Sequence, residues 1–177
     1  MKVNELDNIT GTLSKPSKMP GWAYGIPAKE CKTGSKLAKI PGTVCHGCYA
    51  LKGCYVFPNV QEAQYKRLAA TDHPLWVQAM AAQILRHESK WFRWHDSGDI
   101  QSLEHLKKIF EVCKLTPDVN HWLPTREAGI MQQVTPEEVP ANLIIRISAT
   151  KVDGNPPTFW PYNSAIVTGK QIGRAHV

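Results

Sequence analysis

The chain has 177 residues, of which 21 are Lys or Arg and 15 are Asp or Glu, so its formal net charge at pH 7 is +6. This length fits one domain with a sizeable core, and no apolar run approaches the roughly 20 residues that cross a bilayer. The basic excess is spread along the chain, so it is only a weak indication of nucleic acid or another anionic partner.

The first half of the chain predicts one strand and two helices. Residues 8–13 favour a short strand. Pro58 is typical of the first position of a helix, which we expect to run to about Ala70. A second helix is expected to begin within residues 71–74, with Asp72 as its N-terminal cap. Apolar residues then recur at helical spacing and predict a face that packs on the core: Trp76, Val77, Met80, Ala81, Ile84 and Leu85.

The second half alternates between predicted strands and helices. Strands are expected at residues 91–94, 120–123, 143–147 and 164–167. A helix is expected over 100–115, with Leu103, Leu106, Ile109, Phe110 and Cys113 on its core face. A short helical segment should follow residue 127, and Thr135-Pro136-Glu137-Glu138 has the form of a capping box. This alternation is typical of βαβ units, so we predict an α/β fold, an incomplete (βα) barrel, over residues 1–170.

Polar side chains follow three of the predicted strands at the point where each strand ends. They are His95, Asp96, Ser97 and Asp99 after the first, Thr125 and Arg126 after the second, and Ser148 and Thr150 after the third. Because the carboxyl ends of parallel strands share one edge of a sheet, where α/β proteins bind ligands, we expect one site there. The alternative is that Asp99 or Ser97 only caps the next helix. His95, which no cap requires, favours the site.

Four of the five cysteines lie in one segment: Cys31, Cys45, Cys48 and Cys54. Pro41, Gly42, Gly47 and Gly53 indicate that this segment is a turning loop. Four thiolates on a loop predict a metal or cluster site, because thiolates select zinc, copper(I) or iron–sulfur. Disulfides and unliganded thiols are the alternatives, but disulfides need an oxidising compartment and the first residues lack the apolar core of a signal peptide. Cys113 is expected to be a buried apolar side chain.

Zinc and an iron–sulfur cluster both accept four cysteines. Structural zinc sites usually combine two Cys-x2-4-Cys pairs, whereas only Cys45 and Cys48 form such a pair here. The uneven spacing, with aromatic residues nearby, favours a cluster wrapped by one long loop. We therefore expect a [4Fe-4S] cluster on all four cysteines, with zinc as the alternative.

The tail from Gln171 to Val177 has an unusual property: it back-translates into the start of a widely used short-read sequencing adapter. This interpretation makes residues 171–177 an artefact and indicates a gene from an environmental assembly, cut before its natural end. These residues are left out of the predicted domain.

Three motifs together resemble one family: Cys48-Tyr49-Ala50-Leu51-Lys52-Gly53, then Arg93-Trp94-His95-Asp96-Ser97-Gly98-Asp99, then Pro124-Thr125-Arg126. This combination, over roughly residues 15–150, resembles the phage "gene product 88" family, which looks distantly similar to radical S-adenosylmethionine (SAM) enzymes. The resemblance implies a truncated radical SAM core with a cluster near its first strand. It also implies that residues 95–99 hold the SAM amino group, and that the protein works in the cytoplasm of an infected host cell.

The cysteines depart from the radical SAM pattern. The usual Cys-x3-Cys-x2-Cys leaves one iron free for SAM, whereas Cys31 can close the fourth iron beside Cys45-x2-Cys48-x5-Cys54. A cluster with four thiolates passes electrons but has no open position, so we expect an electron-transfer or accessory redox protein with a redox partner. One alternative is a radical SAM-type enzyme with three cysteine ligands and SAM at the open iron. Another is a zinc-stabilised module that binds nucleic acid.

Overall fold

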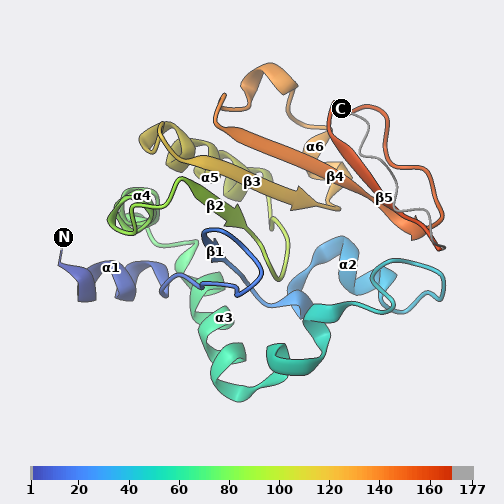
Figure 1. The fold of residues 1–177 in the computed structure, drawn as a ribbon, viewed down its shortest axis with the longest axis horizontal. Coiled ribbons are helices and arrows are strands. Elements are labelled where there is room, and N and C mark those ends of the chain that lie inside the picture. The colour runs from blue at the N-terminus through green and yellow to red at the C-terminus, as the bar shows by residue number, and fades with distance from the viewer. Residues whose placement is uncertain (1, 169–177) are drawn as a thin grey trace.

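The fold is built on an open sheet of parallel strands (Figure 1), seen in a computed structural model that describes residues 2–168. The strands are β1 (Trp22–Tyr24), β2 (Trp91–Trp94), β3 (Asn120–Thr125), β4 (Leu143–Val152) and β5 (Asn163–Ile166), and they lie in chain order across the sheet. The predicted α/β class and parallel sheet are confirmed, and within the described residues the sheet does not close. The predicted tail at 171–177 lies outside those residues.

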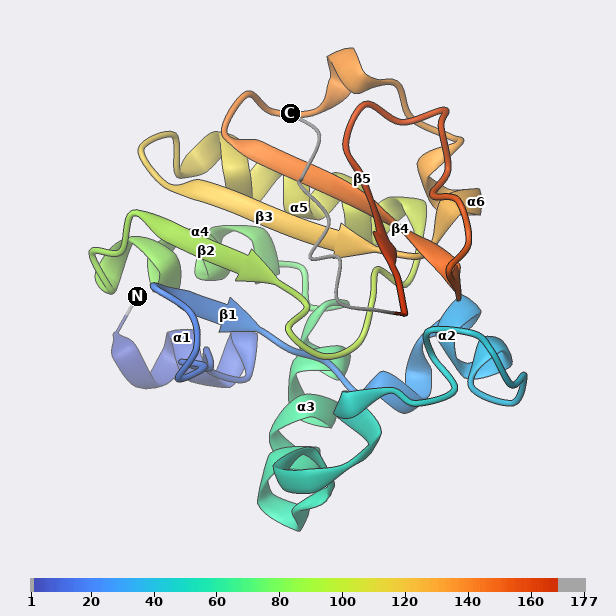
Figure 2. The same ribbon diagram turned by 45° about the vertical axis from the view of Figure 1, so that its right-hand side comes forward.

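The helices of the described chain differ in where they lie relative to the sheet. They are α1 (Val3–Thr10), α2 (Lys32–Leu37), α3 (Pro58–Ala70), α4 (Trp76–Arg86), α5 (Leu103–Leu115) and α6 (Ala128–Met131), with short 3-10 helices η1 (Ala28–Glu30), η2 (Tyr49–Leu51), η3 (Gly53–Val56) and η4 (Pro136–Glu138). Figure 2 shows α4 and α5 behind the sheet, and α1 packs against α4. Between residues 2 and 168, no helix combines the length and apolar character needed to span a membrane.

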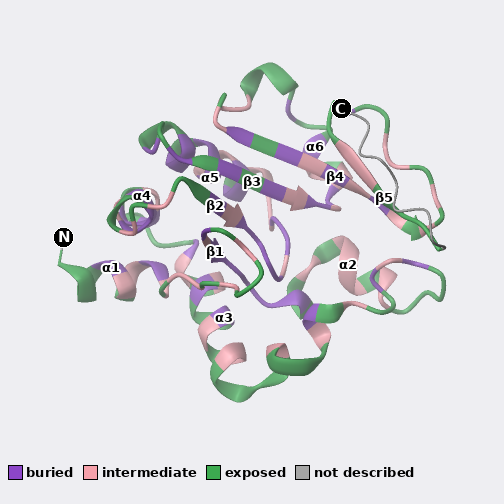
Figure 3. Ribbon diagram, viewed as in Figure 1, coloured by how far each residue is buried: buried purple, intermediate pink, exposed green. Residues whose placement is uncertain are grey.

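The core lies between the sheet and the helices α4 and α5. Trp94, Leu123 and Ile145 come from neighbouring strands and belong to the same buried cluster as Met80 and Ile109 from the two helices. Buried and more exposed residues alternate along β2, β3 and β4 (Figure 3). This alternation follows because successive side chains of a strand point to opposite faces. One face of the sheet therefore forms the core, and the other is turned away from α4 and α5.

Most predicted elements are confirmed. In the second half, all four strands and the helix after 127 are present, and Thr135 forms the capping box with Glu138. In the first half, the helix at 58–70 is present. The helix predicted from residue 100 begins at Leu103, because the Ser102 hydroxyl caps it by accepting the His105 backbone N–H at 3.0 Å. Neither Ser97 nor Asp99 is therefore its cap. Cys113 is fully buried, as predicted.

Three predictions for the first half are wrong. The strand expected at 8–13 is the end of α1, whose side chains at Leu6 and Thr10 are buried one turn apart and which stops at Gly11 in the left-handed conformation. Asp72 caps nothing, since α4 begins only at Trp76. In α4, Leu85 is 49% exposed rather than part of the core face. The strand β1 and the helix α2 were not predicted, because three and six residues show no clear periodicity.

Tyr24 of β1 joins the sheet to three helices. Its buried hydroxyl lies 2.6 Å from the Thr10 carbonyl of α1 and 2.9 Å from the Arg67 carbonyl of α3, and it accepts the indole N–H of Trp76 from α4 at 3.2 Å. Burial raises the pKa of this hydroxyl well above its usual value. The Tyr24 carbonyl also accepts the His95 backbone N–H at 2.9 Å, so the same residue positions the chain that leaves β2.

We predict that Tyr24→Phe lowers the free energy of unfolding by about 1–3 kcal/mol, because buried polar groups on three helices lose their common partner. Chemical denaturation of the purified protein measures the change. The matched control is Tyr65→Phe, since the Tyr65 hydroxyl contacts only the exposed Glu30 and should matter by less than about 0.5 kcal/mol. Equal stability of the two variants would show that Tyr24 does not join these elements energetically.

Candidate functional site

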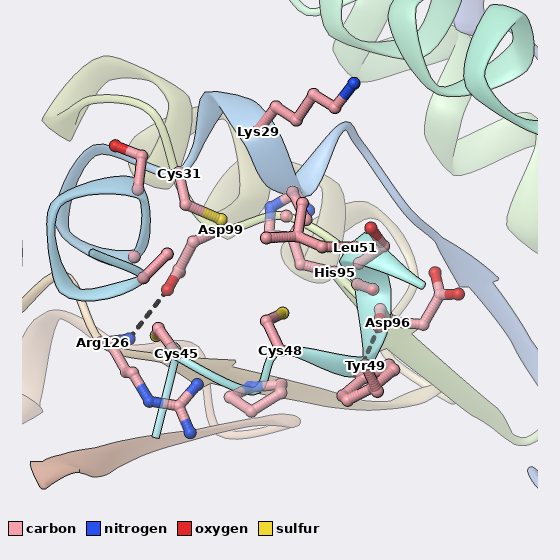
Figure 4. Close-up of a pocket in the computed structure, with 18 of the residues that line it drawn as sticks. Lys29, Cys31, Cys45, Cys48, Tyr49, Leu51, His95, Asp96, Asp99 and Arg126 are labelled. Atoms are coloured by element: carbon pink, nitrogen blue, oxygen red, sulfur yellow. Dashed lines mark hydrogen bonds between the residues drawn. The ribbon is translucent and has the colours of Figure 1, made fainter. Parts of the chain in front are cut away.

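A cavity of about 470 Å³ lies at the edge of the sheet where the strands end (Figure 4). Its walls come from Ala28 beyond β1, residues 95–99 beyond β2, Arg126 beyond β3 and Ser148 of β4, together with the cysteine segment. Six of the eight polar residues predicted at this edge line it: His95, Asp96, Ser97, Asp99, Arg126 and Ser148. Thr125 and Thr150 do not line it. Thr125 is buried, and its hydroxyl donates to Asp99 at 2.6 Å. Parallel pairing thus brings the polar segments to one place.

Three of the four clustered cysteines line the same cavity: Cys31, Cys45 and Cys48. Figure 4 shows their side chains around one opening. A Cβ atom placed on Gly34 would lie 3.6 Å from the sulfurs of both Cys31 and Cys45, so these sulfurs are no further apart than twice that distance. Cys54 differs, because it is exposed in η3 and does not line the cavity. The structure therefore brings together three of the four predicted ligands.

The cysteine segment is tied to the sheet edge at three points. Thr33, two residues after Cys31, donates its backbone N–H and its hydroxyl to the two carboxylate oxygens of Glu127 at 2.8 and 2.7 Å. Next to Cys45, the Val44 N–H donates to the Thr150 carbonyl of β4 at 3.0 Å. Next to Cys48, the Tyr49 hydroxyl donates to the Asp96 carbonyl at 2.5 Å. Each cysteine of the cavity is thus held by its own neighbour.

The segment from His95 to Ser97 carries buried polar atoms that have no hydrogen-bond partner. They are both ring nitrogens of His95, Oδ1 of Asp96 and Oγ of Ser97. His95 also has a φ of 57°, which non-glycine residues rarely adopt. Buried polar groups are normally paired, because an unmade hydrogen bond costs about 1–3 kcal/mol. Unpaired groups and backbone strain on one cavity wall therefore indicate a place for a polar ligand.

Asp99 is a positioning residue that joins the ends of β2 and β3. Its carboxylate accepts the Thr125 hydroxyl at 2.6 Å and the backbone N–H groups of Arg126 and Ile100 at 2.8 Å each. Burial raises the pKa of Asp99 to about 6, although these hydrogen bonds oppose the shift. The sequence left open whether Asp99 caps the next helix or belongs to the site. Asp99 does not cap that helix, because Ser102 caps α5.

Two thiols of the cavity, those of Cys31 and Cys45, have a raised pKa and are shifted toward their protonated form. Burial raises the pKa of Cys31, and the charges of Asp99 and of the thiolates at Cys48 and Cys45 raise it further. Burial also raises the pKa of Cys45, against the opposing charge of Arg126. Thiolates in this cavity therefore need a positively charged partner to be stable. Within residues 2–168, no three His, Cys, Asp or Glu side chains converge closely enough to hold a single metal ion.

Several residues of the site were missed by sequence reasoning. The contact between Thr33 and Glu127 holds α2. Gly34 leaves space between the thiols of Cys31 and Cys45. Arg93, the last residue but one of β2, lines the cavity. Their signals were weak: Gly34 follows Cys31 by three residues, and Arg93 stands directly before Trp94 and His95 in the motif. Only the contacts between segments distant in the sequence show what they do.

The fold and this cavity define an α/β protein with a site of cysteines and buried polar groups at the carboxyl edge of a parallel sheet. Comparison with protein families matches residues 2–169 to the family described as Gene product 88, and the chain belongs to that family. The family predicted from the three motifs is therefore confirmed. A search of the curated proteins finds no match, and a search of the solved structures finds none either.

We predict that Glu127→Ala makes the Cys31 thiol of the metal-free protein react faster with an alkylating reagent. In this variant Thr33 loses both of its hydrogen-bond acceptors, and hydrogen bonds to a charged group contribute about 1.5–3 kcal/mol each. We therefore expect the alkylation rate of Cys31 to rise by about tenfold or more. Peptide mass spectrometry measures each cysteine separately, and the fully buried Cys113 serves as the internal reference.

Glu137→Ala is the matched control for this experiment, because Glu137 is an exposed carboxylate outside the cavity. An unchanged Cys31 rate in Glu127→Ala would contradict the role of the Glu127–Thr33 contact. An equal acceleration of Cys113 would do so too, since it would mean that the whole domain had opened.

Proposed function

We propose that this protein holds a [4Fe-4S] cluster on Cys31, Cys45 and Cys48, and that it is a radical SAM-type enzyme with SAM in the cavity beside the cluster. The observation that carries the proposal is the shared wall: Cys31, Cys45 and Cys48 line one cavity together with residues 95–97, which carry buried polar atoms without a partner. The resemblance to a truncated radical SAM core supports it as well. Because the chain belongs to a family of phage proteins, we infer that this activity is exercised in the cytoplasm of an infected host cell, with a host or phage electron carrier as partner.

The number of thiols decides between an electron carrier and an enzyme. A fourth thiolate would leave no open iron, and the sequence predicted that Cys31 supplies it beside Cys45, Cys48 and Cys54. Because Cys54 is exposed and lies outside the cavity, the geometry favours the arrangement with three thiolates. The chemistry that a bound cluster supplies in this arrangement is the transfer of one electron to a ligand at its open iron.

The cavity offers room and charge that fit such a group. Gly34 matters here, because a Cβ at this position would lie 2.9 Å from the Cys31 Cβ and would fill the space between two sulfurs. The thiols of Cys31 and Cys45, whose pKa values are raised, would be stabilised as thiolates by the positive charge of iron.

The polar wall fits the amino-acid end of SAM. Asp96 Oδ1 and Ser97 Oγ are buried acceptors without partners, which suits an ammonium group. Arg126 also lines the cavity and offers a guanidinium for a carboxylate. His95 supplies a neutral ring, because burial and the neighbouring His105 keep its pKa well below the usual value.

We predict that replacing Cys31, Cys45 or Cys48 by Ser removes the cluster, whereas Cys54→Ser and Cys113→Ser keep it. Iron and sulfide assays on anaerobically reconstituted protein measure this outcome. Cys113→Ser is the control for thiol loss in a folded core, and Cys54→Ser separates three ligands from four. Loss of the cluster in Cys54→Ser would restore the four-thiolate electron carrier as the better interpretation.

We also predict that SAM changes the electron paramagnetic resonance spectrum of the reduced protein and that 5′-deoxyadenosine is formed. Asp96→Asn with Ser97→Ala should weaken SAM binding by about tenfold or more at unchanged iron content, since two charge-assisted contacts are lost. An unaltered spectrum in the wild type, with full iron content, would overturn the enzyme proposal and leave the cluster proposal standing.

A further inference from the structure

The face of the sheet turned away from α4 and α5 is toward the viewer in Figure 2. It carries large side chains in contact with solvent. We call it the open sheet face and define it by Trp91, Arg93, Trp122, Ile144, Arg146 and Ser164. Trp91 is 51% exposed, Trp122 38% and Ile144 46%. Indole rings and an aliphatic side chain gathered on one face are typical of an interaction surface.

The open sheet face has an ordered arrangement of aromatic and cationic groups. Arg93, Trp122 and Ile144 are direct neighbours across three strands. The Arg93 guanidinium lies 4.7 Å from the centre of the Trp122 ring. Trp91 pairs with Asn120, which makes Trp91 the diagonal neighbour of Trp122, at roughly 7–8 Å between backbones. Two indoles thus stand side by side with a guanidinium stacked on one of them.

The surface is hollowed and carries only positive charge. A groove of about 490 Å³ is lined by Trp91, Trp122, Ile144, Arg146 and Ser164, among others. No Asp or Glu is among the described residues that line it. Arg146 therefore presents its guanidinium group to a ligand without a competing carboxylate among these lining residues. An anionic ligand with flat, apolar groups matches this surface.

We propose that the open sheet face binds single-stranded nucleic acid, with bases stacked on Trp122 and Trp91 and a phosphate on Arg146. Aromatic side chains on a sheet stack unpaired bases, and guanidinium groups bind the backbone. A duplex fits less well, because its bases are stacked on one another and present no free faces. The inference stands on the open sheet face alone and is independent of the cluster.

The test is fluorescence anisotropy with a labelled oligothymidylate, using the full chain in one defined cluster state. The wild type should bind, and its binding should weaken with salt. Trp122→Ala should weaken binding by about fivefold or more, since stacking contributes about 1–3 kcal/mol per base. Trp122→Phe keeps a stacking ring and should recover most of the affinity. Arg146→Gln should weaken binding and reduce the slope of its salt dependence, because one phosphate contact is lost.

Tyr65→Ala is the matched control, because Tyr65 is an aromatic residue of similar exposure (43%) on α3, and it should bind as the wild type does. If Trp122→Ala disturbs folding, as circular dichroism would show, Trp91→Ala tests the same surface at a more exposed position. The proposal is overturned if Trp91→Ala and Arg146→Gln bind like Tyr65→Ala, or if a duplex of the same length binds more tightly. It is also overturned if light scattering shows that a second copy of the chain covers this face.

Discussion

Parallel pairing of the strands is the constraint on which the rest of the structure depends. Every strand runs in the same direction as its neighbour, so each connection must return to the opposite edge before the next strand begins. The segments that leave β1, β2 and β3 therefore start from the same edge. The long connection between β1 and β2 contains the four clustered cysteines. This is why thiols and polar groups that are distant in sequence meet in one cavity.

Two buried carboxylates hold that edge together. Asp99 links the ends of β2 and β3, and Glu127 links the end of β3 to α2 and so to Cys31. Both accept hydrogen bonds from backbone N–H groups, which fixes the path of the chain as well as the side chains. The unpaired atoms of His95, Asp96 and Ser97 belong to the segment directly before Asp99. A rigid support beneath unpaired groups is what a preorganised binding site requires.

The sequence predicted the elements whose burial follows a clear period and missed those that depend on distant contacts. β2, β3, β4, α4 and α5 alternate or repeat regularly, and they were predicted. The helix α3 was predicted from Pro58 at its first position. The three residues of β1 are strand because Trp22 to Tyr24 pair with Phe92 to Trp94, a contact that no local pattern contains. In the site, the polar residues after each strand could be predicted from topology. The separation of Cys54 from the other cysteines could not, because spacing along a loop does not determine which thiols face inward.

The anchoring of the cysteine loop bears on how relatives of this chain can be recognised. Cys31 is positioned through Thr33, and Cys45 through Val44 and the bridge between Thr43 and Lys151, so each is docked on the sheet separately. The stretch between them, residues 39–42, is exposed, and lengthening a surface loop costs little free energy. The number of residues from the first thiol to the second is thus free to drift during evolution while the sulfurs stay in place. A search pattern with fixed intervals would pass over such homologues, whereas the Thr33–Glu127 pair would still identify them.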